Sequence, residues 1–174
     1  MITVNSLSGG KTSSYIAAHY PADYNVFSLV RTNDKNCIFP DKKLRQVVSD
    51  KIGKEFIGTL EMDEIIYTML DLEQYIGQEI HWVSGRSFDE VIKRGDKVYL
   101  PNKVQRFCTI EMKLKPIMEW WKKNINEPIE QRIGFRANEQ KRAKSMLQRA
   151  DEDGFLYEKF IVGKNKKYKK WKSF

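Results

Sequence analysis

The sequence has few cysteines and no long apolar run. Two of its 174 residues are cysteines, which does not support a disulfide framework, a CxxC metal site or an iron–sulfur cluster. No stretch approaches the roughly eighteen apolar residues that a membrane span needs. With 41% hydrophobic and 31% charged residues, the composition is typical of a soluble protein. No secretory signal is visible at the N-terminus, so we expect a cytoplasmic protein without a membrane partner.

The net charge of +8 is concentrated near the C-terminal end of the sequence. Residues 159–174 contain seven lysines and no acidic residue, whereas the rest of the chain carries 24 basic and 23 acidic side chains. We therefore divide the chain into a domain over residues 1–158 and a basic tail over residues 159–174. The tail is interpreted as a solvated terminus, as a DNA or RNA contact because Tyr168 and Trp171 stand among its lysines, or as the start of a longer C-terminal segment.

Short β-branched segments alternate with helical patterns along residues 1–150. Strands are predicted over residues 2–5, 26–30, 55–58 and 130–135, and helices over residues 12–20, 40–52, 65–76, 87–93, 115–125 and 138–150. Pro40 and Pro116 are each expected in the first turn of a helix, and the rest of residues 78–108 is assigned to loops. The alternation predicts an α/β fold with a mostly parallel, twisted sheet and helices on both faces.

The segment Ser8-Gly9-Gly10-Lys11-Thr12-Ser13 directly follows the first predicted strand. Glycines that allow a close approach, N–H groups that open a helix and several side-chain donors are features of a phosphate-binding loop. Gly10-Lys11-Thr12 matches the end of a Walker A loop, but Asn5 stands where that loop needs its first glycine. The pyrophosphate-loop pattern SGGxxS is matched in full and is favoured. A glycine turn with a Ser/Thr helix cap is a third interpretation, which does not account for Lys11.

This segment resembles the pyrophosphate loop of the adenine nucleotide alpha-hydrolase superfamily, in its phosphoadenosine phosphosulfate reductase-like branch, which includes phage members. Residues 106–113, Arg-Phe-Cys-Thr-Ile-Glu-Met-Lys, are followed by Pro116 and are similar to the branch's central [RW]CT…K…P segment. Residues 134–143, Gly-Phe-Arg-Ala-Asn-Glu-Gln-Lys-Arg-Ala, are similar to its G-x-R-x-x-E-x-x-R-A segment. The resemblance implies a Rossmann-like, adenine nucleotide alpha-hydrolase-like fold.

The resemblance also implies an adenine nucleotide as ligand, either ATP or phosphoadenosine phosphosulfate. Relatives that act on ATP release pyrophosphate, whose charge the loop N–H groups, a lysine and Mg²⁺ neutralise. The expected catalytic residues are Lys11, Arg106 and Lys113. The expected nucleotide-binding residues are Ser8, Gly9, Gly10, Lys11, Thr12, Ser13, Arg31, Thr32, Asn33, Gly134, Arg136, Glu139 and Arg142. No residue is expected to ligate a metal directly, since His19 and His81 lack partners at metal-ligand spacing.

Some of these residues also have plainer interpretations. Arg31 fits an exposed loop arginine, and Cys108 fits a small buried thiol without reactivity. Glu139 and Arg142 are three residues apart on a predicted helix, so they fit a surface ion pair as well as ligand contacts.

Two departures from the family pattern leave the reaction open. Thr12 occupies a position where aspartate is common, and no cysteine follows Cys108 to act as the reductases' C-terminal cysteine does. Three functions therefore stay as alternatives: an AMP-forming or sulfonucleotide enzyme, a nucleotide-binding module without turnover, and a component of sulfur transfer or nucleic-acid modification. Assembly as a homodimer or within a larger modification complex is consistent with the resemblance.

Overall fold

The computed structural model of the chain describes residues 1–102, 105, 107–153, 156–162 and 169–171. The chain divides into two compact units, each built from segments that are distant in the sequence. Unit 1 comprises Met1–Val26, Thr68–Ile80 and Ile125–Phe174, and unit 2 comprises Phe27–Tyr67 and His81–Asn124. The predicted domain over residues 1–158 therefore contributes to both units.

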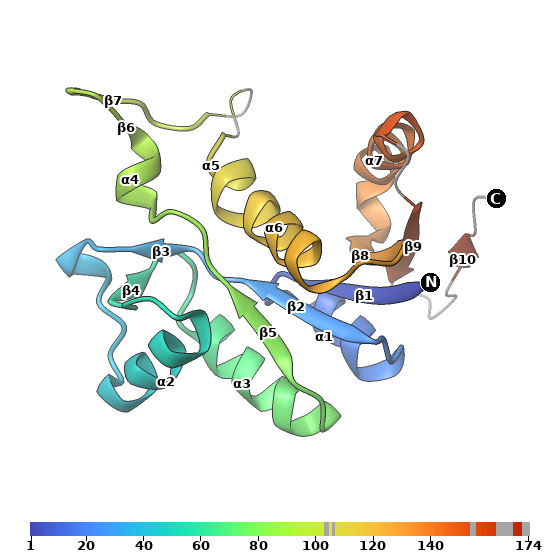
Figure 1. Cartoon of the computed structure of the whole chain (residues 1–174), viewed down its shortest axis with the longest axis horizontal. Coiled ribbons are helices and arrows are strands. Elements are labelled where there is room, and N and C mark those ends of the chain that lie inside the picture. The colour runs from blue at the N-terminus through green and yellow to red at the C-terminus, as the bar shows by residue number, and fades with distance from the viewer. Residues whose placement is uncertain (103–104, 106, 154–155, 163–168, 172–174) are drawn as a thin grey trace. The chain divides into compact units, whose positions relative to one another are not determined.

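The largest sheet has the strand order β10-β9-β8-β1-β2-β5 (Figure 1). These strands are β1 (Ile2–Leu7), β2 (Tyr24–Ser28), β5 (Ile80–Val83), β8 (Ile129–Arg136), β9 (Leu156–Val162) and β10 (Lys169–Trp171). β8 runs parallel to both β1 and β9, and β10 runs antiparallel to β9. Parallel strands together with helices confirm the predicted α/β fold. Residues 159–162 and 169–171 of the predicted basic tail belong to β9 and β10.

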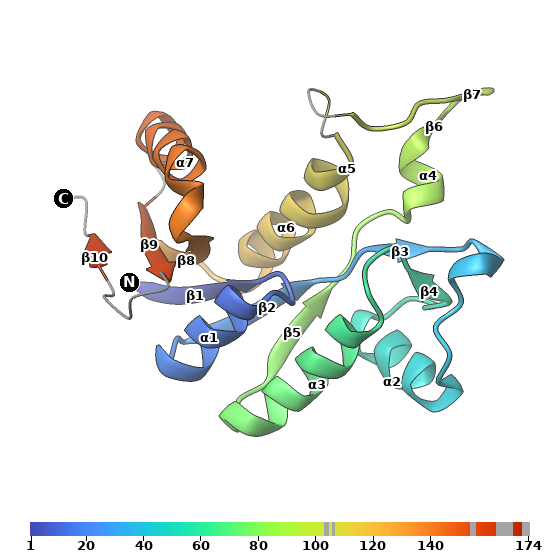
Figure 2. The ribbon, with the colours of Figure 1, turned by 180° about the vertical axis from the view of Figure 1, so that it is seen from behind.

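Helices cover both faces of the sheet in unit 1. The unit contains α1 (Lys11–His19), most of α3 (Glu64–Ile76), the short 3-10 helix η3 (Ala137–Glu139) and α7 (Gln140–Asp153). Successive residues of a strand point to opposite faces. A Cβ atom built on Gly134 would lie 2.8 Å from Thr12 Cγ2 of α1, whereas the Phe135 ring lies 5.7 Å from the guanidinium of Arg142 on α7. Figures 1 and 2 show α1 and α7 on opposite sides of β8 and β1.

The described residues of unit 2 form short helical segments and two short antiparallel strand pairs. The helical segments are η1 (Lys35–Cys37), α2 (Lys42–Ile52), α4 (Phe88–Ile92), α5 (Phe107–Thr109), the π-helix η2 (Ile110–Leu114) and α6 (Lys115–Asn124). β3 (Arg31–Thr32) pairs with β4 (Gly58–Thr59), and β6 (Lys93–Arg94) pairs with β7 (Lys97–Val98), both antiparallel. Phe27, Leu29, Phe39, Val48 and Phe56 are buried in its core.

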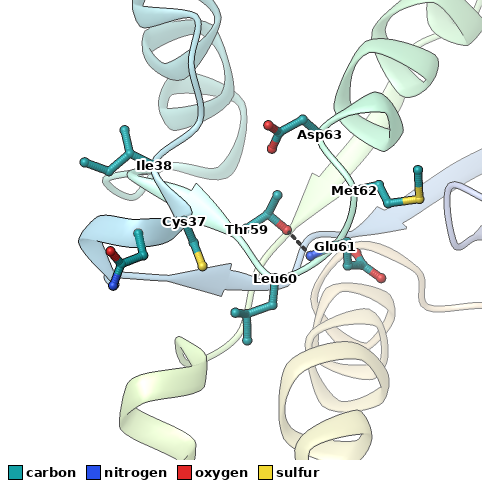
Figure 3. A pocket seen from close by; sticks show the side chains of 8 residues that line it. Cys37, Ile38, Thr59, Leu60, Glu61, Met62 and Asp63 are labelled. Atoms are coloured by element: carbon teal, nitrogen blue, oxygen red, sulfur yellow. Dashed lines mark hydrogen bonds between the residues drawn. The ribbon is translucent and has the colours of Figure 1, made fainter.

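A pocket of about 380 Å³ opens in unit 2 beside η1 and β4 (Figure 3). Eight residues line it: Asn36, Cys37, Ile38, Thr59, Leu60, Glu61, Met62 and Asp63. The Thr59 hydroxyl accepts a hydrogen bond from the Glu61 N–H at 3.0 Å and donates one to the Val30 carbonyl at 2.8 Å, which fixes one wall.

The prediction that Pro40 lies in the first turn of a helix is wrong. Asp41 is the N-cap of α2, because its Oδ1 accepts hydrogen bonds from the N–H groups of Lys43 at 2.8 Å and Leu44 at 3.0 Å. Aspartate at this position satisfies two N–H groups that the helix leaves unpaired, so the helix begins after it and the proline precedes the cap.

Pro116 lies in the first turn of α6, as predicted, but α5, η2 and α6 follow one another without a break over residues 107–124, so the proline has helical residues on both sides. A proline inside a helix cannot donate to the carbonyl four residues earlier, here that of Met112. The hydroxyl of Ser28 donates to this carbonyl at 2.9 Å. The π-helical turn and this side-chain bond together accommodate the proline.

Residues 78–108 contain more regular structure than the sequence predicts. β5 and the β6–β7 hairpin lie in this range, where loops are predicted apart from one short helix. The predicted helix over residues 87–93 is confirmed as α4, whose N-cap is Ser87. Of the predicted strand over residues 55–58, only Gly58 lies in a strand, because β4 comprises Gly58 and Thr59. No helix in the described part of the chain is long and apolar enough to cross a membrane.

Candidate functional site

The loop between β1 and α1 is closed by its own first and last serines. Ser13 Oγ accepts a hydrogen bond from the Ser8 N–H at 3.2 Å, lies 3.3 Å from Ser8 Oγ and donates to the Gly10 carbonyl at 2.9 Å. Gly9 between them has a φ of 71°, a left-handed conformation that favours glycine. The two serines of the SGGxxS pattern therefore shape the loop from within.

Five successive backbone N–H groups in this loop are unpaired. From Gly9 to Ser13, none hydrogen-bonds to another described residue, and the first one that does is that of Ser14, which donates to the Gly10 carbonyl at 3.1 Å. Gly10 is the N-cap of α1 and has no side chain to satisfy these donors. Unpaired N–H groups at the positive end of a helix dipole favour an anion. Lys11 adds an exposed ammonium group without a hydrogen-bond or ion-pair partner among the described residues.

The first and third predicted motifs meet in unit 1. Parallel pairing of β1 with β8 aligns Asn5 with Arg132, so the carboxyl ends of these strands lie at the same edge of the sheet. Gly134 contacts the first turn of α1, because the space that its missing side chain leaves is occupied by Thr12 and Ile16. In this structure Gly134 therefore allows the close approach of α1 to β8. The predicted contact of Gly134 with a nucleotide stays a prediction.

Arg136, Glu139 and Arg142 form a chain of contacts at the end of β8. The Glu139 carboxylate accepts hydrogen bonds from the Arg136 N–H at 2.9 Å and from the Arg142 guanidinium at 2.8 Å. These two hydrogen bonds, the backbone one first, lower the pKa of Glu139. The predicted surface ion pair is confirmed. The side chain of Arg136 is exposed, and its charge also lowers the pKa of Glu139, so this second cation lies near that carboxylate.

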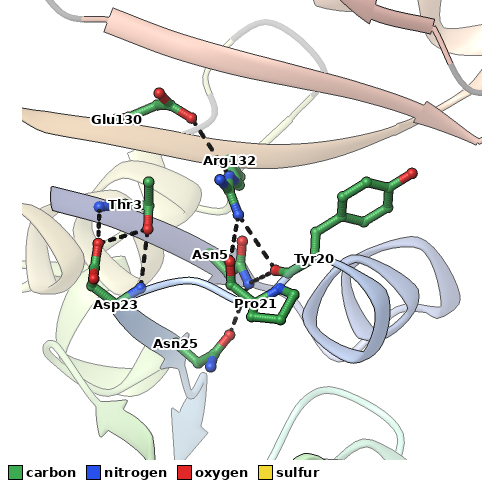
Figure 4. Close-up of polar contacts among 8 residues, drawn as sticks. All are labelled: Thr3, Asn5, Tyr20, Pro21, Asp23, Asn25, Glu130 and Arg132. Atoms are coloured by element: carbon green, nitrogen blue, oxygen red, sulfur yellow. Dashed lines mark hydrogen bonds and ion pairs between the residues drawn. The ribbon is translucent and has the colours of Figure 1, made fainter. Parts of the chain in front are cut away.

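The residues at the far end of α1 are fixed by polar contacts (Figure 4), of which those of Asn5 are the most buried. Asn5 is 1% exposed, and its Nδ2 donates to the Tyr20 carbonyl at 3.1 Å and to Asn25 Oδ1 at 3.0 Å. Arg132 donates to the Pro21 carbonyl at 2.9 Å, and the Thr3 N–H and hydroxyl both donate to the Asp23 carboxylate at 2.7 Å, which lowers the pKa of Asp23. The residues that follow α1 are therefore tied to β1 and β8.

In unit 2, Arg31 of β3 joins two loop segments. Its guanidinium donates to Ser84 Oγ at 2.7 Å, to the Glu55 carbonyl at 3.0 Å and to the Gly85 carbonyl at 3.0 Å. Burial lowers the pKa of Arg31, against the opposing effect of Glu90. The interpretation as an exposed loop arginine is wrong, because the side chain is half-buried and structurally engaged.

Thr32 and Asn33 are joined to Asp89 of α4. The Thr32 hydroxyl, which is buried, donates to Asp89 Oδ2 at 2.9 Å, and the Asn33 N–H donates to the same oxygen at 2.7 Å. Burial raises the pKa of Asp89, but these bonds and the charge of Lys93 outweigh it and lower the pKa overall. The Asn33 side chain is left exposed.

The central predicted motif is only partly described. Arg106 lies outside the described residues. Lys113 pairs with the carboxylate of Glu61, and the second oxygen of that carboxylate is buried without a hydrogen bond. Cys108 is half-buried against the cluster of Val30, Val91 and Met112, which agrees with a packing thiol. Arg31, Thr32, Asn33 and Lys113 belong to unit 2, and the loop belongs to unit 1.

The sequence did not predict the pocket in unit 2 or the exposed lysines of α7. No residue that lines the pocket was a candidate, because its walls come from separate segments without a shared motif. Lys141 of α7 lies inside the third motif, between its arginines, and Lys144 directly follows the motif. An excess of cations in the first turns of a predicted helix is a signal that could have found them. Within the described part of the chain, no three His, Cys, Asp or Glu side chains are grouped to hold a metal ion.

No family model, no curated protein and no solved structure matches the chain. The assignment of a function therefore depends on the geometry of the loop between β1 and α1 and on the motifs in the sequence.

Proposed function

We propose that unit 1 binds an adenine nucleotide, ATP or phosphoadenosine phosphosulfate, with its phosphate or sulfate groups on the loop Ser8–Ser13. The observation that carries this proposal is the run of five unpaired N–H groups beside the exposed ammonium group of Lys11. A fold of the Rossmann-like, adenine nucleotide alpha-hydrolase type is part of the same proposal.

The chemistry of the loop fits a polyphosphate. Its unpaired N–H groups lie at the positive end of the α1 dipole, and Lys11 supplies the charge that a phosphate oxygen prefers. Arg136 adds a second cation at the end of the neighbouring strand β8. Because the serines bond to each other, the loop keeps this shape before a ligand binds, and little conformational entropy is lost on binding.

Mg²⁺ fits this site as an ion that accompanies the nucleotide. No carboxylate stands among Ser8–Ser13, and Thr12 directs its methyl group against Gly134. The ion would therefore be held by phosphate oxygens, where it would neutralise charge on a leaving pyrophosphate. Lys11 and the loop N–H groups would bind and orient the same pyrophosphate.

Two activities are compatible with this site. The resemblance favours release of pyrophosphate from ATP with formation of an adenylated substrate. The position of Thr12 favours a nucleotide-binding module without turnover, because its side chain packs on β8 and offers no charge to a metal or nucleotide.

The decisive binding test compares two lysines that each occupy the first position of a helix. Lys11 opens α1 after Gly10, and Lys42 opens α2 after Asp41, whose carboxylate already satisfies the helix N–H groups. We expect Lys11→Ala to weaken binding of ATP or phosphoadenosine phosphosulfate by about tenfold or more, the loss of one charge-assisted contact. Lys42→Ala should leave the affinity unchanged. Calorimetric titration of both variants and the unmodified protein provides the measurement.

Product analysis then separates the activities. AMP and pyrophosphate from Mg-ATP indicate adenylation, ADP indicates a Walker-type enzyme, and binding without product indicates the module. Equal affinities of Lys11→Ala and Lys42→Ala, or no binding of any of these nucleotides, would contradict the proposal.

A further inference from the structure

We propose that the outward face of α7 binds the phosphodiester backbone of a nucleic acid. We call Lys141 and Lys144 the α7 basic face. It lies in unit 1, as does the candidate loop, but its binding to nucleic acid does not require a nucleotide to be bound there. The basic tail is a different segment, so this interface is additional to the one that the sequence predicts.

The two lysines point away from the core. Ala143 between them is 0% exposed and marks the side of α7 that packs on the unit, whereas Lys141 and Lys144 are both exposed. Three residues apart on a helix, they are neighbours on its surface. Neither has an ion-pair or hydrogen-bond partner among the described residues.

These cations occupy unfavourable positions for the isolated protein. The positive end of a helix dipole disfavours cations, and like charges three residues apart repel each other. The 3-10 helix η3 runs directly into α7, and its acidic residue, Glu139, is already bonded to the Arg136 N–H and the Arg142 guanidinium. Glu139 compensates Arg142, but no described carboxylate compensates the basic face. A bound anion removes both unfavourable interactions.

The surroundings favour a nucleic acid over a membrane or a protein. The exposed positions of Arg136 to Lys144 whose side chains are described are Arg136, Asn138, Gln140, Lys141, Arg142 and Lys144. No large apolar side chain is exposed among them. An interfacial helix needs an apolar face to enter a membrane, and a protein interface is centred on buried aromatic or apolar side chains. Lysines, arginines and amides are the side chains that contact phosphates and sugars.

The test measures nucleic-acid affinity of the full chain with two matched double variants. Lys141→Gln/Lys144→Gln neutralises the basic face, and Lys122→Gln/Lys123→Gln removes the same charge from exposed lysines in the last turn of α6. Both keep the lysines of the tail, so its contribution cancels. Fluorescence anisotropy with a 20-nucleotide single strand of DNA, its duplex and the matching RNA distinguishes the ligands.

We expect Lys141→Gln/Lys144→Gln to weaken binding of at least one of these ligands by about tenfold at 50 mM salt and to reduce the slope of log affinity against log salt by about 2, as for the loss of two phosphate contacts. The control pair should retain the affinity and slope of the unmodified chain. Without nucleic acid, the melting temperature of the α7 variant should be equal to or higher than that of the unmodified chain, because repulsion is removed.

Three outcomes would overturn the proposal: equal loss of affinity in both double variants, no loss in either, or a lower melting temperature of the α7 variant, which would make the lysines structural. A selective loss of binding to phosphatidylserine vesicles with unchanged nucleic-acid affinity would overturn it too. Failure of the nucleotide site would instead appear as unchanged ATP affinity in Lys11→Ala, which these measurements do not involve.

Discussion

Gly134 sets how closely α1 approaches β8. A Cβ atom there would lie 2.8 Å from Thr12 Cγ2 and 3.1 Å from Ile16 Cδ1, closer than packed atoms allow. Gly134→Ala should therefore push the first turn of α1 outward, lower the free energy of unfolding by about 1–3 kcal/mol and weaken nucleotide binding. Urea unfolding and calorimetric titration measure the two effects.

A second substitution tests this explanation. Thr12→Ser removes the methyl group that the new Cβ would meet, so Gly134→Ala/Thr12→Ser should recover part of the stability lost in the single variant. If the loss of unfolding free energy in the double variant equals the sum of the losses in the two single variants, the contact with Thr12 is not the cause of the instability.

Asp89 makes the stability of unit 2 depend on pH. Its pKa is lowered in the folded protein, so its charge stabilises the fold above the unfolded pKa of about 4, and this contribution is lost as the pH falls through the folded pKa. We expect Asp89→Asn to lower the free energy of unfolding by about 1 kcal/mol at pH 7, and by progressively less below about pH 4. Unfolding at a series of pH values measures the difference, with the exposed Asp71→Asn as control. A pH-independent difference would contradict this account.

At the scale of elements, the continuous helical run over residues 107–124 depends on one hydroxyl. Pro116 cannot donate to the Met112 carbonyl, and Ser28 does so. Ser28→Ala should leave this carbonyl unpaired and lower the free energy of unfolding by about 1–3 kcal/mol. Pro116→Ala restores a backbone donor, so the double variant should lose less than Ser28→Ala alone. Thermal or urea unfolding measures both variants. If Ser28→Ala and Ser28→Ala/Pro116→Ala lose the same free energy of unfolding, the hydroxyl has another role.

The elements that the sequence predicted well are those with a local signal. β1, α1, α3 and β8 are each marked by periodic apolar residues and by glycine or proline near their ends. β5 was missed because four residues with Ile80 and Trp82 buried are too short to show alternation. In β9 the lysines of the tail obscured an apolar pattern, and the start of α2 was misplaced because Pro40 and Asp41 are adjacent helix-start signals.

At the scale of the whole molecule, the candidate loop could be predicted because all its parts are contiguous. The surroundings of Arg31 could not, because the groups that it binds come from two loops, one before β4 and one after β5. Division into two units was not predictable either, since each unit combines segments that are not contiguous in the sequence. Short-range patterns indicate elements, but contacts between distant loops depend on the packing of the complete fold.

The pairing of β1 with β8 also bears on how the protein matures during synthesis. β1 leaves the ribosome long before β8, one of its two neighbours in the sheet, which begins only at Ile129. Until translation has passed that point, the nascent glycine loop lacks the strand against which α1 is seated. Such sequence-distant contacts slow folding, so β1 and the glycine loop are exposed to chaperones and to aggregation until β8 has been made. Competence to bind a ligand should therefore arise only after β8 has left the ribosome.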